Sequence, residues 1–322
     1  MKRIRLYGKG NARPEKRTQG AARVQCRSLW KCLAYCVGVA LLAACTSKTA
    51  PEKTVTVTIE PQRYFAEAIA GDKYTVKSMV GAGFNPEEYD PTPRQMVDLG
   101  KSEAYFRIGP IGFEQVWMNR IRENNPGLRI FDLSEGFDFT ADAHGDEEEE
   151  DGHGHAHAHG GADPHLWSSI AGAKLIASNT LQAFIALDPE NKAYYTDNYR
   201  SLLQDINETE QELHSQLDTL QNRTFIIYHP ALTYLAREFG LKQLPIELDG
   251  KEPSPAQLKR LIETARDNGV EVVFVQQEFD KKNAELIANE TGCTLVSINP
   301  LSYDWHGEMV RISNALAHGQ AD

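Results

Sequence analysis

Residues 54–80 have the sequence TVTVTIEPQRYFAEAIAGDKYTVKSMV, and this stretch decides the fold. Its β-branched start predicts a strand at 54–59, and Pro61 begins a helix that ends near Gly71. A second strand is predicted at 74–80, before a Gly/Pro-rich loop at 81–93. Because strand, helix and strand follow one another so closely, the pattern indicates an α/β lobe with a mainly parallel sheet.

The same alternation extends along the rest of the chain. Pro189 begins a long helix that runs to about Leu220; its apolar positions are scattered, so we expect it to be exposed over much of its length and to bridge two lobes. The sequence therefore predicts two α/β lobes, 54–188 and 223–322, joined by a single long helix within 189–222. Further strands are expected at 104–108, 128–131, 224–228, 243–246, 271–275 and 294–298, and further helices at 94–100, 113–123, 168–187, 233–239, 255–268, 281–291 and 305–317.

The N-terminus has the features of an export signal. Residues 1–31 are strongly basic, and a short apolar run follows that ends in L-L-A-A-C at Cys45. A basic segment, an apolar segment of about a dozen residues and a small-residue exit are typical of a secretory signal. The ending resembles the lipobox of bacterial lipoproteins, so we expect a signal peptide at 1–44, lipid attachment at Cys45 and a tether at 45–53.

Charge and cysteine content agree with export. The chain has 34 basic and 45 acidic residues, a net charge of −11. Removing residues 1–44, with ten basic residues and one acid, leaves 24 basic and 44 acidic residues, a net charge of −20. Such an acidic protein is a poor nucleic-acid binder and suits a cationic ligand, although the charge also serves solubility. Cys293 is the one cysteine beyond Cys45, and we expect it to be a small core residue.

Residues 141–162 interrupt the alternation. They contain an acidic run, Asp146 to Asp151, and then four histidines separated by glycine and alanine. Such a composition cannot bury a core, so we expect a disordered loop. The loop could collect metal loosely, or it could be a tolerated low-complexity insertion. Its histidines are His153, His155, His157 and His159.

Metal-binding types of side chain follow several predicted strands, at the edge where open α/β sheets bind ligands. His229 directly follows strand 224–228, and Glu278 lies three residues past strand 271–275. Because four of five such positions come from strand exits, we expect them to converge in a cleft between the lobes. In chain order they are Glu87, His165, His229, Glu278 and Asn299.

Five motifs around these residues resemble those of the metal-binding proteins of bacterial ABC importers, in the family's order and over essentially the whole exported chain. With the acidic histidine-rich loop, they are most similar to the zinc-specific, ZnuA-type branch of the cluster A-I family. The stretches are N-P-E-E-Y-D-P-T-P at 85–93 (family D-P-H-x-Y-E-P-T-P), D-P-H-L-W at 163–167 (D-P-H-x-W), Y-H-P-A-L-T-Y-L at 228–235 (H-D-A-x-x-Y-F), E-P-S-P at 252–255 and I-N-P-L at 298–301 (L-D-P-L).

The resemblance implies a site with one histidine from each of three motifs, plus a carboxylate or water. His165 and His229 carry over unchanged, whereas Glu87 stands where the family has its first histidine and Asn299 replaces the aspartate of L-D-P-L. Carboxylate oxygen binds zinc at about 2.0–2.2 Å, so we predict Glu87, His165 and His229 as ligands, with water or both Glu87 oxygens completing the set. Asn299 and Glu278 are weaker candidates. The alternative for Glu87 is a solvated loop acid, and for Glu278 a surface acid that caps the next helix.

The donor set favours zinc without excluding other metals. Imidazole suits zinc, copper, iron and nickel, whereas oxygen ligands suit manganese. A Glu-His-His set is intermediate, and the histidine-rich loop favours zinc. The sequence therefore predicts Zn²⁺ as the captured ion, with Mn²⁺ or Fe²⁺ as the alternative.

The resemblance also implies the partners: a membrane permease and a cytoplasmic ATPase. The protein is expected to be a non-enzymatic monomer, held by lipid on the outer side of a membrane, in the periplasm or at the cell surface. A zinc hydrolase is a distant rival, since Glu-His-His with an open position is also a catalytic ligand set. No H-E-x-x-H motif supports it. An adhesin role, assigned to some surface lipoproteins of this family, has no direct support in the sequence.

Overall fold

The computed structural model describes residues 53–139, 162–248 and 250–319. The predicted signal peptide, Cys45, the tether as far as residue 52, and the four histidines His153, His155, His157 and His159 lie outside these residues.

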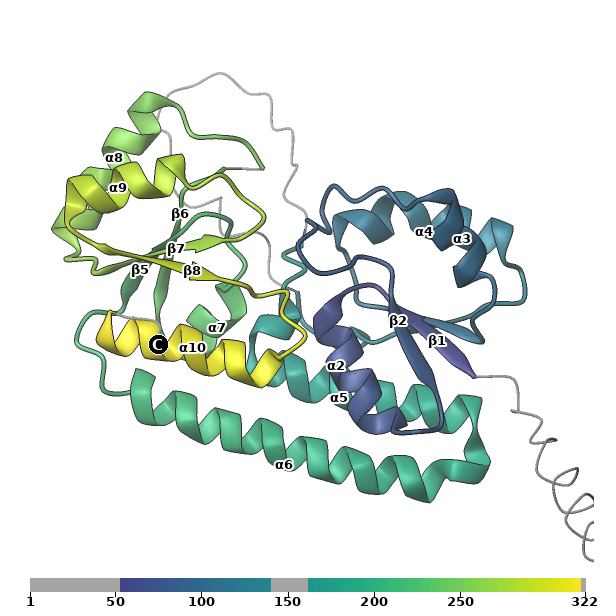
Figure 1. The fold of residues 1–322 in the computed structure, drawn as a ribbon. Helices are drawn as coiled ribbons and strands as arrows, with labels where there is room; N and C mark the ends of the chain where they lie inside the picture. The colour runs from purple at the N-terminus through teal and green to yellow at the C-terminus, as the bar shows by residue number, and fades with distance from the viewer. Residues whose placement is uncertain (1–52, 140–161, 249, 320–322) are drawn as a thin grey trace, which may run out of the picture. The chain divides into compact units, whose positions relative to one another are not determined.

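The first lobe is built on a four-stranded parallel sheet in the order β2-β1-β3-β4. Val55 of the central strand β1 pairs with Val76 of β2 on one side and Ala104 of β3 on the other. Helix α2 lies on one face of the sheet, and α3 and α4 lie on the other (Figure 1). The elements are β1 (Thr54–Val57), α2 (Glu60–Ala70), β2 (Thr75–Ser78), α3 (Pro93–Leu99), β3 (Ala104–Arg107), α4 (Gly112–Asn124) and β4 (Arg129–Asp132).

The second lobe repeats this topology, with a parallel sheet in the order β6-β5-β7-β8. Strands β5 and β7 are buried except for Thr224, and α8 and α9 cover one face while α7 and α10 cover the other (Figure 1). The strand order reverses between β5 and β7, which is where open α/β sheets bind ligands. The elements are β5 (Thr224–Ile227), α7 (Thr233–Glu238), β6 (Lys242–Pro245), α8 (Pro255–Asp267), β7 (Val272–Gln276), α9 (Lys282–Thr291), β8 (Thr294–Ile298) and α10 (Trp305–His318).

Four elements connect the two sheets: η1 (Leu166–Ser168), α5 (Ile170–Leu187), η2 (Pro189–Asn191) and the 26-residue α6 (Lys192–Leu217). Exposed side chains recur along the whole length of α6, as expected, but they occupy only one side of the helix. One stripe of α6, including Ile206, is fully buried. This stripe packs α6 against α2 and α5 of the first lobe and α10 of the second. The scattered apolar residues of α6 therefore form a continuous buried face.

The hydrophobic core follows from this arrangement. One cluster runs from Val55 in β1 through α5 and α6 to Phe274 in β7 and Trp305 in α10, so the two lobes share a common apolar layer. A second cluster fills the space between the sheet of the second lobe and helices α8 and α9. Helix α5 is long and apolar enough for a membrane span, but half of it is buried in the shared layer. We therefore interpret α5 as a core helix.

Local sequence signals explain where the helices begin. Thr92 caps α3 by accepting a hydrogen bond from the amide of Gln95, and Ser254 caps α8 in the same way through Gln257. Both caps precede a proline, which fits the first turn of a helix because its missing N–H needs no partner. The predicted α/β alternation is confirmed, with strand β8 at its predicted residues. Cys293 is only partly buried, beside the second cluster.

Candidate metal centre

A small pocket opens between the two lobes, with a cavity volume of about 20 Å³. Such a volume suits a single water molecule or ion. Its walls come from the loop after β2, the segment before η1, and the loops that follow β5, β7 and β8. Four predicted site residues line it: Glu87, His165, His229 and Glu278.

The two histidines face one another across the lobe boundary. Nε2 of His165 lies 3.1 Å from Nε2 of His229, and their ring planes are inclined by 70°. Zinc binds imidazole nitrogen at about 2.0–2.1 Å, so two nitrogens on a tetrahedral zinc are about 3.3 Å apart. The observed separation is close to that value, although the two histidines are 64 positions apart in the chain.

Each imidazole is oriented by a carboxylate on its other nitrogen. Nδ1 of His165 lies 2.8 Å from Oδ1 of Asp163, and Nδ1 of His229 lies 2.5 Å from Oε1 of Glu247. Burial acts to raise the pKa of Asp163, but the charge of His165 and hydrogen bonds to its carboxylate lower the pKa overall. An ionised carboxylate accepts a hydrogen bond from Nδ1–H, and a neutral imidazole in that tautomer carries its lone pair on Nε2. This carboxylate–histidine pairing is typical of metal-binding histidines.

Backbone contacts hold both histidines in place. The amide of His165 donates to Oδ1 of Asp163, and the hydroxyl of Tyr234 donates to the Asp163 carbonyl. The side chain of Gln276, at the end of β7, accepts from the amide of His229 and donates to its carbonyl oxygen. The ring of Phe279 stacks on His229 at 5.3 Å. The two imidazoles are therefore fixed before any ion arrives.

Tryptophan residues fasten the histidine segment to the second lobe. Nε1 of Trp167 donates to the carbonyl oxygen of Pro300 at 2.9 Å, and Nε1 of Trp305 donates to the carbonyl oxygen of Trp167. The Trp167 ring lies 5.1 Å from the ring of His165. His165 is thus connected through its neighbours to the loop that follows β8.

Glu87 has two differently placed carboxylate oxygens. Oε2 accepts a hydrogen bond of 2.8 Å from the amide of Gly112, the first residue of α4, where the helix dipole favours negative charge. Oε1 is buried and has no hydrogen-bond partner. The amide of Glu87 is held by Oδ1 of Asn85. The Glu87 carboxyl group is therefore held through Oε2, and its Oε1 has no partner at the pocket.

Glu278 also has a buried carboxylate oxygen, Oε1, without a hydrogen-bond partner. Burial raises the pKa of this carboxyl group. The alternative role, capping the helix after it, belongs to a neighbour, because Oδ1 of Asp280 accepts the hydrogen bond from the amide of Lys282 at the start of α9.

Asn299 is not among the residues that line the pocket. Its amide donates to Oε1 of Glu308 at 2.6 Å, and its side-chain oxygen is buried without a partner. Asn299 remains a predicted ligand that the described structure places outside the pocket wall.

The predicted ligands do not form a complete coordination set in the part of the chain that the structure describes. Within residues 53–139, 162–248 and 250–319, no three histidine, cysteine or acidic side chains stand at metal-coordinating positions together. The histidine pair is preset, and the carboxylates of Glu87 and Glu278 border the same pocket.

Sequence reasoning missed Glu247 and Gln276, which position His229. Gln276 ends β7 and Glu247 follows β6, so the criterion that selected His229, a polar side chain at the end of a strand, applies to both of them. Glu247 directly follows Ile246 at the end of the expected strand 243–246, and this position in the sequence was a usable signal; the structure buries the side chain.

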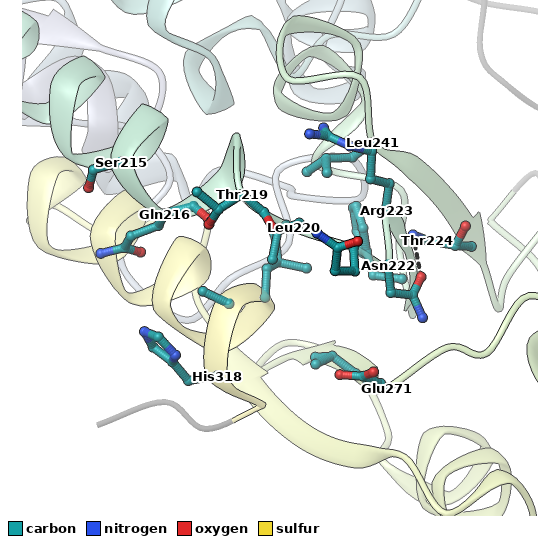
Figure 2. Close-up of a pocket in the computed structure, with 15 residues that line it drawn as sticks. Ser215, Gln216, Thr219, Leu220, Asn222, Arg223, Thr224, Leu241, Glu271 and His318 are labelled. Atoms are coloured by element: carbon teal, nitrogen blue, oxygen red, sulfur yellow. Dashed lines mark hydrogen bonds between the residues drawn. The ribbon is translucent and has the colours of Figure 1, made fainter.

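A larger cavity of about 430 Å³ lies at the N-terminal ends of the strands of the second sheet, opposite the ends that the small pocket adjoins (Figure 2). The end of α6, the start of β5 and the end of α10 surround it, and Arg223, Glu271 and His318 are on its wall. The guanidinium of Arg223 donates to the backbone carbonyls of Phe239 and Asp218. Because the guanidinium of Arg223 is already bound to the backbone, we favour the small pocket over this cavity as the binding site.

Two α/β lobes with paired imidazoles between them define a bilobal metal-binding protein. Residues 55–314 match the family described as the periplasmic component A of the zinc-uptake complex, and the chain belongs to this family. The family consists of extracytoplasmic binding components of metal importers. The chain is therefore a substrate-binding protein and not an enzyme, which removes the hydrolase alternative.

Individual relatives point to more than one metal. The chain is 29% identical to the high-affinity zinc uptake system protein ZnuA of Bacillus subtilis over 251 residues, covering 77% of this chain and 78% of that protein. It is 26% identical to the manganese-binding lipoprotein MntA of Halalkalibacterium halodurans over 230 residues, covering 70% and 71%. A crystal structure of ZnuA superposes with a TM-score of 0.74 at 34% identity, covering 83% of this chain and 98% of that one.

Proposed function

We propose that this protein captures Zn²⁺ outside the cytoplasm, at a site formed by Glu87, His165 and His229, and passes it to a membrane importer. The observation that carries the proposal is the pair of Nε2 atoms 3.1 Å apart, each on a ring whose Nδ1 faces a carboxylate. Two imidazole nitrogens at this separation, in a pocket the size of one ion, match the spacing of two ligands on a tetrahedral metal. The family's role in zinc uptake supports the same conclusion.

The choice of zinc rests on the two imidazoles, which suit zinc better than manganese. Mn²⁺ or Fe²⁺ is the alternative cargo, because a carboxylate replaces the third imidazole. A carboxylate also adds negative charge at the pocket, where none of the lining residues that the structure describes is a lysine or arginine. This charge attracts any divalent cation, so selectivity depends on donor type and geometry.

Delivery requires the other parts of an importer, and we infer a permease and a cytoplasmic ATPase as partners. We also propose that the chain is exported, attached to lipid through Cys45, and active as a monomer. The histidine-rich loop with His153, His155, His157 and His159 would collect ions near the site. Mass spectrometry of the membrane-extracted protein tests the lipid, since a chain that begins at a diacylated Cys45 is expected.

Calorimetric titration of the signal-free protein with Zn²⁺ tests the site. We expect one strong site in the parent and large losses of affinity in Glu87→Ala, His165→Ala and His229→Ala. His214→Ala is a matched control, because His214 is exposed on α6 and far along the chain from the pocket. If the three site variants bind zinc as tightly as the parent, the proposed site is wrong.

A further inference from the structure

The predicted ligand set leaves one coordination position unassigned, and the pocket wall offers a residue for it. Glu278 is on the wall, whereas Asn299, which occupies the position of the family's aspartate, is not. Both side chains have a buried oxygen without a hydrogen-bond partner. Leaving a buried acceptor unpaired is unfavourable, and more so for a charged group, so such an atom at a pocket indicates a missing partner.

Glu278 lies next to the His229 segment, and no positively charged residue lies among the described residues of the pocket wall. Phe279 is next to it in the chain and stacks on His229, while Gln276 fastens the backbone of His229 to the same strand end. Glu278 is thus attached to the element that fixes one of the imidazoles. No lysine or arginine is among the described residues of the pocket wall, so no protein cation is available there to neutralise the two glutamates.

Two of the four carboxyl groups at or next to the histidine pair already have a partner. Asp163 and Glu247 are occupied by the Nδ1 atoms of the histidines. Glu87 and Glu278 keep one buried oxygen each. An ion that gathered both glutamates would have two nitrogen and two carboxylate donors. Manganese prefers oxygen donors, whereas zinc is satisfied by nitrogen donors and a single carboxylate or water.

We propose that Glu278, and not Asn299, supplies the second carboxylate ligand, and that this ligand extends the range of transported ions from Zn²⁺ to Mn²⁺. This inference rests on the proposed function of the His165–His229 site. It assigns a metal-ligating role to the loop after β7, where a flexible side chain next to Phe279 can turn its free oxygen towards the histidine pair. Zinc retains Glu87, His165 and His229 without it.

The test compares affinities for Zn²⁺ and Mn²⁺ in the signal-free protein, with zinc by calorimetry and manganese by the electron paramagnetic resonance signal of the unbound ion. In Glu278→Gln we expect the Mn²⁺ affinity to fall about tenfold or more while the Zn²⁺ affinity changes less. The matched control is Glu285→Gln, an exposed acid on α9 of the same lobe. A second comparison is Asn299→Ala, in which both affinities should stay at the parent values.

Each result decides a different point. If the ratio of zinc to manganese affinity is the same in Glu278→Gln as in the parent, or if Asn299→Ala reproduces the manganese loss, the inference is overturned. If the parent binds neither ion, the proposed function itself fails. Thermal melting of the metal-free variants shows whether they are folded. If Glu278→Gln is not folded, the metal affinities of Glu278→Asp are measured instead, because this change shortens the side chain and keeps its charge. Lower manganese affinity in Glu278→Asp supports the inference, and parent-like affinity contradicts it.

Discussion

At the scale of single residues, the proposed site depends on groups that would not touch the ion. Gly112 is one of the supporting positions, because its amide holds Oε2 of Glu87. A Cβ atom at this position would lie 2.8 Å from Oε2 of Glu87 and even closer to the Glu87 carbonyl oxygen. Both atoms belong to the segment that presents the carboxylate, so a methyl group must displace that segment.

Gly112→Ala is therefore expected to lower the affinity for zinc by about tenfold, as changes around metal ligands commonly do. Calorimetry measures the affinity. Gly127→Ala is the control, because a Cβ there would meet no atom within 4 Å. Equal affinities in the two variants would show that the position of Glu87 does not matter.

Glu247 tests the orientation of His229 in the same way. Glu247→Gln keeps an oxygen that can accept the hydrogen bond from Nδ1–H but removes the charge that makes the imidazole a better donor to a metal. We expect the zinc affinity to fall by about tenfold. Glu271→Gln, at an exposed position just before β7, should bind like the parent. No change in Glu247→Gln would mean that the contact only packs the loop.

At the scale of elements, a buried carboxyl group joins α4 to the first sheet. Glu114 accepts hydrogen bonds from the amides of Ile108 and Gly109 and pairs with Arg107 at 3.1 Å. Thr58, after β1, donates to the same carboxyl group. Burial raises the pKa of Glu114, and these contacts offset part of that effect.

A raised pKa makes the folded state bind a proton more tightly than the unfolded state. The contribution of Glu114 to the free energy of unfolding is thus lost as the pH rises from the unfolded pKa, near 4.5, through the higher folded value. Glu114→Gln should be less stable than the parent at low pH, because its NH2 group can only donate, whereas both oxygens of the carboxyl group face the amide donors of Ile108 and Gly109. The difference in the free energy of unfolding between the parent and Glu114→Gln should decrease as the pH rises. Urea unfolding of both proteins without metal, at several pH values, measures this difference. A difference that stays constant with pH would contradict the raised pKa of Glu114.

Sequence periodicity was sufficient for most elements and failed where packing between elements decides. The alternation of apolar strands and capped helices located β1 to β8, since Pro61, Thr92 and Ser254 mark helix starts through local chemistry alone. The burial of Ile206 in α6 could not be predicted, because it depends on which helices pack against it. For the site, strand exits and motif order led to His165, His229, Glu87 and Glu278. The position of Asn299 outside the pocket wall depends on three-dimensional packing after β8.

At the scale of the whole molecule, several contacts cross from one lobe to the other. Trp167 and Trp305 form two hydrogen bonds across the boundary, and the hydroxyl of Tyr303 donates to Glu67 of α2 at 2.6 Å. Arg63 also covers the ring of Tyr303 at 4.5 Å. With α6 packed on both lobes, these contacts oppose a wide opening of the cleft.

Small-angle X-ray scattering of the signal-free protein should therefore give nearly the same radius of gyration with and without zinc, differing by less than about 1 Å. Loop and side-chain movement near Glu87 is sufficient to complete the site. A clear decrease on adding zinc would show that the lobes close as rigid bodies. In that case the tryptophan contacts must break in the metal-free state.

Trp167 gives the protein a built-in optical reporter. Its indole ring is buried, lies 5.1 Å from the ring of His165 and is fixed by the hydrogen bond to Pro300. A paramagnetic ion such as Mn²⁺ bound at His165 would dim the emission of this ring, whereas Zn²⁺, with its filled d shell, has no such effect. Tryptophan fluorescence can thus distinguish bound Mn²⁺ from bound Zn²⁺. Comparing the signal-free parent with Trp167→Phe separates the emission of Trp167 from that of Trp117 and Trp305.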